Sequence, residues 1–310
     1  TPPKPGENGP SVCVVDSGIA TNHPLLANNI GHAISILTEQ ESESDGNGHG
    51  TMVAGLAVFG DLRVRCKEGT FQSDITLYSA RVLNEENRFD DESLIIQQMR
   101  SAIESFHQTP YNCRVFNLSL GSNEPWLPEN QRQGVWAEAL DILARELDVI
   151  IVVSAGNHRQ GYALATEDAE EILNSYPDFL FDEDSGLCEP ATAAIPIVVG
   201  GIANSDVPAI PRQIHENDIV QVIAQKNEPS PITRVGPGIN DAIKPEFLAS
   251  AGNYSFQGFG NIRMVKDDKG LAVMSLSNDP TKSMFGFDVG TSFAAPLVSR
   301  SAAILLNKLE

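Results

Sequence analysis

Three polar side chains of this sequence could together carry out nucleophilic catalysis. Asp16 directly follows an apolar run at residues 12–15, whereas His49 and Ser292 each lie in a glycine-containing segment. A serine hydroxyl is a weak nucleophile near neutral pH, and an imidazole has a pKa suited to removing its proton. A carboxylate can hold the second imidazole nitrogen and so fix the tautomer. The three residue types therefore fit a serine nucleophile, a histidine base and an orienting aspartate.

Each of these residues also has a plainer interpretation. An aspartate after a strand is usually a turn former, a single histidine is often an exposed loop residue, and a serine before a helix is often its N-cap. Placement favours the catalytic hypothesis, because each residue stands at the end of an expected strand or the start of an expected helix. Proteins of the α/β class present functional groups at such positions.

The elements that must position these residues follow from the hydrophobic pattern. Short β-branched runs alternate with helix-period stretches, so we expect an α/β fold around a mostly parallel sheet. Two crossover helices are expected at residues 94–106 and 135–147, and two further helices begin beside His49 and Ser292. The expected strands are residues 12–15, 75–82, 115–120, 149–153, 197–201 and 219–223.

Composition narrows the class of protein. The 310 residues carry a formal net charge of −20, and such an acidic surface repels phosphate backbones and anionic lipid headgroups, so nucleic-acid and membrane partners are not expected. No apolar run reaches the roughly 18 residues that a transmembrane helix needs. Four widely spaced cysteines without a CxxC pair are predicted to be free thiols, which favours an intracellular compartment.

The order Asp16, His49, Ser292 and the segments around these residues resemble the subtilisin-like serine proteases, the subtilases (peptidase S8). The resemblance rests on DSG at 16–18, HGT-x-VAG at 49–55, SLG at 119–121, SAGN at 154–157 and GTS-x-AAP at 290–296. Residues 243–252 are similar to the KPD-x-x-APG stretch of that family, with Glu246, Ser250 and Ala251 as departures. The resemblance implies a three-layer α/β/α fold and a serine endopeptidase that works through an acyl-enzyme intermediate.

The resemblance also implies further site residues. The side-chain amide of Asn157 would donate to the oxyanion, beside backbone N–H groups at the start of the Ser292 helix. Considered alone, an asparagine after Ala-Gly is most often a turn residue. The segments expected to bind extended peptide consist of Ser119, Leu120, Gly121, Ser154, Ala155 and Gly156.

No cofactor or metal ion is expected. Subtilases often bind structural calcium in the loop after the histidine helix, but residues 61–67 of this chain are basic and lack an Asn/Asp cluster. Residues 45–48 lack the spaced carboxylates and the closing glutamate of an EF-hand. Structural calcium, implied by the family, therefore has no support in this sequence.

An acidic insertion is expected at about residues 158–190, directly after Asn157. It has nine acidic residues against one base, Arg159. Such a charge run is often only a solvated loop. The alternative hypothesis is that this acid, together with acid at residues 90–92, favours Lys or Arg before the scissile bond of the substrate.

The organisation of the chain leaves two function classes open. With no internal repeat or low-complexity linker, residues 1–310 are expected to form a single domain. Because subtilases usually have additional chain at both ends, we expect a catalytic domain from a longer protein with flanking domains. The favoured hypothesis is an active endopeptidase that cleaves peptide or protein substrates. The alternative is a pseudoprotease domain that binds a peptide or partner without cleaving it.

Overall fold

A seven-stranded parallel sheet forms the centre of the molecule. The computed structural model describes residues 2–6, 8–37, 42–89, 91, 94–122, 132–158, 169–209, 219–258 and 263–309. The strand order is β2-β3-β1-β4-β5-β6-β8, and every neighbouring pair is parallel. These strands are β1 (Ser11–Asp16), β2 (Ile30–Ser35), β3 (Thr76–Arg81), β4 (Val115–Leu118), β5 (Ile150–Ser154), β6 (Ile197–Ile202) and β8 (Phe247–Ser250).

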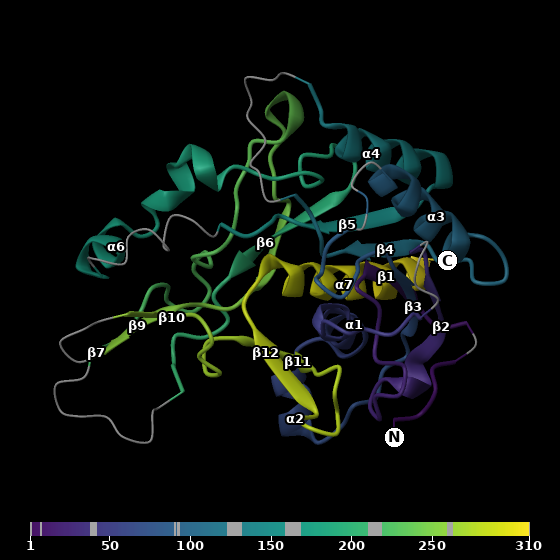
Figure 1. Cartoon of the computed structure of the whole chain (residues 1–310), viewed down its shortest axis with the longest axis horizontal. Helices are drawn as coiled ribbons and strands as arrows, with labels where there is room; N and C mark the ends of the chain where they lie inside the picture. The colour runs from purple at the N-terminus through teal and green to yellow at the C-terminus, as the bar shows by residue number, and fades with distance from the viewer. Residues whose placement is uncertain are drawn as a thin grey trace.

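Helices cover both faces of this sheet (Figure 1). The helices α3 (Ile95–His107) and α4 (Val135–Leu147) pack on one face, and α1 (His49–Phe59) and α7 (Ala295–Leu309) pack on the other. Within β1, Cys13 and Val15 join the core beneath α3 and α4, whereas Val12 and Val14 join the core around α1. Successive strand residues point to opposite faces, so an unbroken apolar strand needs cover on both. The expected three-layer α/β/α fold is confirmed.

The strand order brings the candidate site residues to one edge of the sheet. β1 lies between β3 and β4, and the chain passes from β3 across to β4 on the other side of β1. Such a switch point opens a crevice beyond the carboxyl ends of parallel strands. Asp16 ends β1, Ser119 follows β4, and Asn157 lies shortly after β5. The three residues therefore leave neighbouring strands at the same edge.

Helix α1 is enclosed on every side. All of its residues from Gly50 to Phe59 are buried, because the sheet, α7 and the antiparallel pair of β11 (Val273–Leu276) and β12 (Phe285–Asp288) surround it. A helix in such a position needs no polar face. His49, the first residue of α1, is therefore carried by a helix fixed on all sides.

Two expected elements differ from the observed fold. Residues 219–223 form β7 (Ile219–Val222), but this strand belongs to a separate antiparallel sheet with β9 (Ser255–Gly258) and β10 (Arg263–Val265). An apolar run predicts a strand without specifying its neighbours. The expected strand at 115–120 ends at Leu118.

The basic stretch after α1 is helical, as α2 (Leu62–Glu68), and the side chain of Asp61 caps it by accepting from the Arg63 N–H.

The described part of the acidic insertion, residues 169–190, contains three short helical segments. It contains α6 (Ala169–Ser175) and two 3₁₀ turns, η4 (Asp178–Phe181) and η5 (Glu183–Ser185). Ile172 and Phe179 pack with Ile223 and Phe256 in a small core of their own. The insertion therefore packs beside the three-stranded antiparallel sheet of β7, β9 and β10 (Figure 1). Residues 159–168, including Arg159, lie outside the described residues.

The described residues also show the state of the cysteines, the absence of a membrane-spanning helix and the remaining short 3₁₀ turns. Four cysteines, all of them described, form no disulfide, as predicted, and Cys66 alone is exposed. Among the described helices, none is both long enough and apolar enough to cross a membrane. The other 3₁₀ turns are η1 (Ala27–Asn29), η6 (Ile239–Asp241) and η7 (Thr291–Phe293).

The packing of α1 predicts that Gly55→Ala destabilises the protein. A Cβ at Gly55 would lie 2.6 Å from the Ser275 Oγ and 2.8 Å from the Leu276 Cγ. Alanine is favoured over glycine in a helix by about 0.5–1 kcal/mol, but overpacking a core costs about 1–3 kcal/mol. We expect the free energy of unfolding, measured with urea, to fall by about 1–2 kcal/mol. Gly6→Ala is the control, because nothing lies within 4 Å of its added Cβ; a more stable Gly55→Ala protein would contradict the packing argument.

Candidate active site

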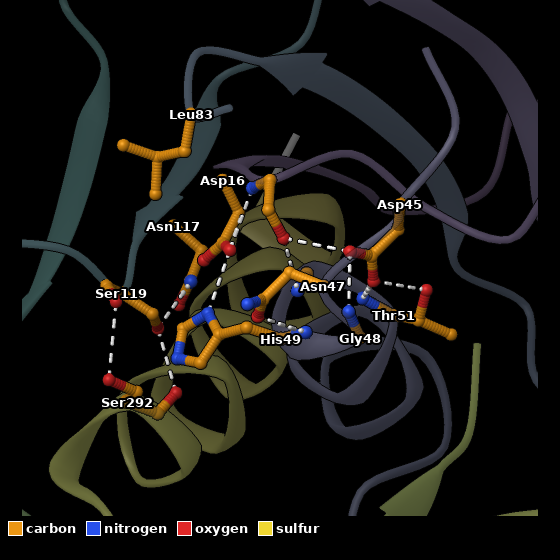
Figure 2. Close-up of polar contacts among 12 residues, drawn as sticks. Asp16, Asp45, Asn47, Gly48, His49, Thr51, Leu83, Asn117, Ser119 and Ser292 are labelled. Atoms are coloured by element: carbon orange, nitrogen blue, oxygen red, sulfur yellow. Dashed lines mark hydrogen bonds and ion pairs between the residues drawn. The ribbon is translucent and has the colours of Figure 1, made fainter. Parts of the chain in front are cut away.

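Asp16 and His49 are in direct contact. The Asp16 Oδ1 and the His49 Nδ1 are 2.7 Å apart, and the Asp16 side chain is 0% exposed against 16% for His49. When Asp16 is ionised, the His49 Nδ1 carries the proton of this bond and the Nε2 is left as an acceptor. Figure 2 shows the imidazole ring lying between Asp16 and Ser292. The sequence-predicted trio is therefore brought together in space.

The charges around His49 favour its protonated form. Burial lowers the pKa of His49, but the charge and hydrogen bond of Asp16, with the further charges of Asp45 and Asp288, leave it raised above its ordinary value. An imidazolium at this position is thus stabilised by three carboxylates. Asp288 is exposed at the end of β12, whereas Asp16 and Asp45 are buried.

Main-chain contact sets the separation of Asp16 and His49. The turn after β1 and the first turn of α1 are so close that a Cβ at Gly50 would lie 2.1 Å from the Gly18 carbonyl oxygen. Gly18 has a φ of +96°, and a Cβ there would lie 2.4 Å from the Glu43 carbonyl oxygen. A side chain at Gly50 would push the two elements apart, and one at Gly18 would displace the segment that leads into α1. The glycines of the DSG and HGT segments therefore serve close approach.

Asp45 fixes the start of α1 through both of its carboxylate oxygens. The Oδ1 accepts from the Gly48 N–H at 2.7 Å and from the Ser17 hydroxyl at 3.0 Å. The Oδ2 accepts from the Thr51 N–H at 2.8 Å and the Thr51 hydroxyl at 2.6 Å. The Ser17 Oγ in turn accepts from the Gly50 N–H, so one carboxylate ties the residue after Asp16 to the helix that carries His49 (Figure 2). Burial raises the pKa of Asp45, although these hydrogen bonds oppose the shift.

Ser292 is held against the end of β4. It lies in η7, and α7 begins three residues later at Ala295, so a helix begins beside Ser292, where the sequence predicted one. Its hydroxyl donates to the Ser119 carbonyl at 3.2 Å, and the Ser119 hydroxyl donates to the Ser292 carbonyl at 2.7 Å. Asn117 donates to the Ser119 Oγ and accepts from the Ser299 hydroxyl, each at 2.9 Å. Ser292 is therefore positioned from β4 by two reciprocal bonds and a buried amide.

Asn157 is oriented by the residue that precedes Ser292. Its Oδ1 accepts from the Thr291 N–H at 2.9 Å and the Thr291 hydroxyl at 3.1 Å. With the amide oxygen held in this way, the Nδ2 is left to donate, and no described residue accepts a hydrogen bond from it. The Nδ2 also lies 3.3 Å from the position of a Cβ at Gly290. The amide donor therefore faces the turn that carries Ser292.

The other predicted site residues lie on either side of this centre. Ala155 and Ser154 are buried, and the Ala155 N–H donates to the Val199 carbonyl of β6. Gly156 donates its N–H to the Thr291 Oγ1. Leu120 is buried beside the exposed Gly121. The two segments thus lie at the carboxyl ends of β4 and β5, and both are linked by hydrogen bonds to the turn that carries Ser292.

Three supporting residues were missed by the sequence analysis. Asn117 is a polar residue inside an otherwise apolar strand, which is a signal of a buried hydrogen bond. Asp45 was weighed only as a calcium ligand, although an aspartate just before a helix also predicts a cap. Arg81, 1% exposed, donates to the Ser44 and Leu83 carbonyls and so anchors the segment before Asp45. No local pattern identifies such a long-range anchor. Within the described ranges, no cluster of three or more His, Cys, Asp or Glu side chains could hold a metal ion.

The fold is similar to those of solved protease structures. A cold-adapted subtilisin-like serine proteinase is similar with a TM-score of 0.55 and 17% identity, over 96% of this chain and 75% of that one. A lanthipeptide protease is similar with a TM-score of 0.59 and 20% identity, over 98% of this chain and 75% of that one. At this level of identity the likeness shows a shared fold.

Comparison of sequences places the family. An uncharacterised protein y4bN of Sinorhizobium fredii (strain NBRC 101917 / NGR234) is 35% identical over 212 residues, which are 68% of this chain and 48% of that protein. The subtilisin-like serine protease AsES of Sarocladium strictum is 29% identical over 163 residues, 52% of this chain and 36% of that protein. The chain thus matches less than half the length of either relative. The sequence model of the subtilase family matches residues 7–310, and the chain belongs to that family.

Proposed function

We propose that this chain is a serine endopeptidase in which Ser292 is the nucleophile, His49 the general base and Asp16 the group that orients the base. The observation that carries the proposal is the 2.7 Å contact between Asp16 and the His49 Nδ1, with the imidazole ring lying between Asp16 and Ser292 (Figure 2). Membership of the subtilase family supports it, as does the name of the relative from Sarocladium strictum, a subtilisin-like serine protease.

Acylation begins when the Ser292 hydroxyl turns from the Ser119 carbonyl toward the His49 Nε2. As the Oγ attacks the carbonyl carbon of the peptide bond, its proton passes to the Nε2. The His49 imidazolium then gives this proton to the leaving amine as the C–N bond breaks. Water, activated by the same imidazole, later cleaves the acyl-enzyme ester and regenerates Ser292. Asp16 stabilises the imidazolium throughout.

The negative charge on the attacked carbonyl oxygen needs donors that are already in place. The Asn157 Nδ2 is one, since Thr291 holds the other end of that amide. The backbone N–H of Ser292 is the second donor. Preorganised donors of this kind supply much of the rate of acyl transfer because they need no rearrangement during the reaction.

The substrate lies as an extended strand between residues 119–121 and 154–156 in this proposal, with backbone hydrogen bonds supplying affinity. The acidic insertion supplies a preference for a basic residue before the scissile bond. Asp182 and Asp184 are exposed. Burial and the charge of Arg234 lower the pKa of His158, the neighbour of Asn157, and the charges of both aspartates oppose this shift, so both carboxylates act close to Asn157. The carboxylates of Asp90 and Glu92, which the sequence analysis grouped with them, lie outside the described residues.

Labelling with a fluorophosphonate tests the proposed function. The wild-type protein should react at Ser292, because the reagent needs an activated serine, and Ser292→Ala should abolish labelling. Ser301→Ala, an exposed serine of α7, is the matched control and should label like wild type. Correctly folded wild-type protein that resists labelling would favour the pseudoprotease that binds without cleaving.

The charge of Asp288 predicts a shift in the pH profile of cleavage. Asp288 helps to raise the pKa of His49, and the base must be neutral to act, so activity is lost as pH falls through that pKa. Asp288→Asn lowers the pKa of His49, and the acidic limb of kcat/KM should therefore move to lower pH. Added salt should shrink the difference, since Asp288 is exposed. The control is Asp74→Asn, which changes an exposed residue before the amino end of β3, away from the site. This variant should leave the acidic limb where it is in wild type. The same shift in both variants would contradict the effect assigned to Asp288.

A set of matched peptides tests the proposed preference for basic residues. With Arg, Leu or Glu before the scissile bond, wild-type kcat/KM should be highest for Arg. Asp182→Asn with Asp184→Asn should reduce the Arg-over-Leu ratio by about fivefold, equivalent to the ~1 kcal/mol of one exposed ion pair. Asp74→Asn with Asp148→Asn removes the same charge at the amino ends of β3 and β5, and should preserve the ratio. Equal cleavage of all three peptides by wild type would leave the insertion as a solvated loop.

A further inference from the structure

Arg234 is a buried cation that donates a hydrogen bond to the main chain of Asn157. The residue is 6% exposed. Its Nε donates to the Asn157 carbonyl at 3.2 Å, and its Nη1 donates to the Asp184 and Gly186 carbonyls, each at 2.7 Å. The aliphatic part of the Arg234 side chain packs closely on Gly156, the residue before Asn157. A Cβ at Gly156 would lie 3.0 Å from the Arg234 Cδ. No described carboxylate forms an ion pair with Arg234, so main-chain carbonyls solvate its charge.

The segment that carries Arg234 runs between Asn157 and the acidic insertion. On one side, Thr233 forms a β-bridge with Asn157, and the His158 N–H donates to the Ile232 carbonyl at 2.7 Å. On the other side, the Val235 N–H donates to the Ser185 carbonyl at 3.0 Å. Residues 232–235 thus join residues 157–158 to residues 185–186, and the Arg234 guanidinium reaches across both.

Two anchors therefore decide where the Asn157 amide points. Thr291 holds the side-chain amide oxygen, and Arg234 holds the main-chain carbonyl of the same residue. A donor stabilises an oxyanion only if it is aimed before the reaction begins. A displacement of about 1 Å in such a group can cost about 10²-fold in rate. The main-chain anchor is thus as important as the side-chain one.

We propose that Arg234 is a positioning residue for transition-state stabilisation, which fixes Asn157 and couples it to the insertion at residues 169–190. This inference rests on the proposed oxyanion role of Asn157. Arg234 acts through the carbonyl of Asn157 and makes no contact with the substrate. Its loss lowers kcat while KM stays unchanged, because only the transition state carries the oxyanion.

A double-mutant cycle with Asn157→Gly tests the inference on a peptide p-nitroanilide. Arg234→Met should lower kcat by about 10–100-fold with KM within about twofold of wild type. Arg234→Lys retains the charge and fewer donors, so its loss of kcat should be smaller. In the Asn157→Gly background, Arg234→Met should lower kcat by less than about twofold, because the amide through which Arg234 acts is already absent.

The control is Arg300→Lys, which alters another partly buried arginine that donates to a main-chain carbonyl, that of Val58 near the far end of α1. Its kcat should match wild type. Equal losses from Arg234→Met in both backgrounds, an effect confined to KM, or an unchanged kcat would overturn the inference. Thermal unfolding verifies that each variant is folded, and Arg234→Lys carries the same cycle if Arg234→Met does not fold. If Asn157→Gly alone leaves kcat unchanged, the oxyanion role itself is wrong and the inference falls with it.

Discussion

Main-chain contact between the turn after β1 and the first turn of α1 is the constraint on which the site depends. At Gly50 the two backbones leave no room for a Cβ, which would lie 2.1 Å from the Gly18 carbonyl oxygen. The backbone separation that the hydrogen bond between Asp16 and His49 spans is consequently set by a strand and a helix. The apolar surroundings of α1 follow from the same contact, since a helix that enters the middle of the molecule must be covered on every side.

Buried polar side chains complete the arrangement by joining segments that are far apart in the sequence. Asn117 reaches Ser299 across 182 residues, and Thr291 reaches Asn157 across 134. Each of these groups would be costly to bury without its partner, so the hydrogen bonds favour one arrangement of the segments over others. The same buried networks that select the fold therefore hold the candidate catalytic groups still.

Local pattern predicted those parts of the structure whose residues share an environment. The strand before Asp16 was predicted because it is apolar on both faces, and α3 and α4 because each has one apolar face. Helix α1 has no such periodicity, and it was predicted from the glycine-rich turn before His49. The edge strand β2 was missed because Gly31 and His32 interrupt its apolar pattern, and β8 because its apolar run is only three residues long. The sheet partners of β7, the cap supplied by Asp45 and the contacts of Arg234 depend on distant residues, which no window of sequence contains.

The contacts of Arg234 bear on how this region can change during evolution. The guanidinium binds carbonyl oxygens of Asn157, Asp184 and Gly186, and every residue type has a carbonyl oxygen. Substitutions among the exposed acids of η5 therefore leave these three acceptors in place, because Arg234 binds main-chain atoms and not side chains. The insertion can therefore acquire a different charge while its attachment to residues 232–235 persists. In the proposed function, selectivity could then change while the position of Asn157 stays the same.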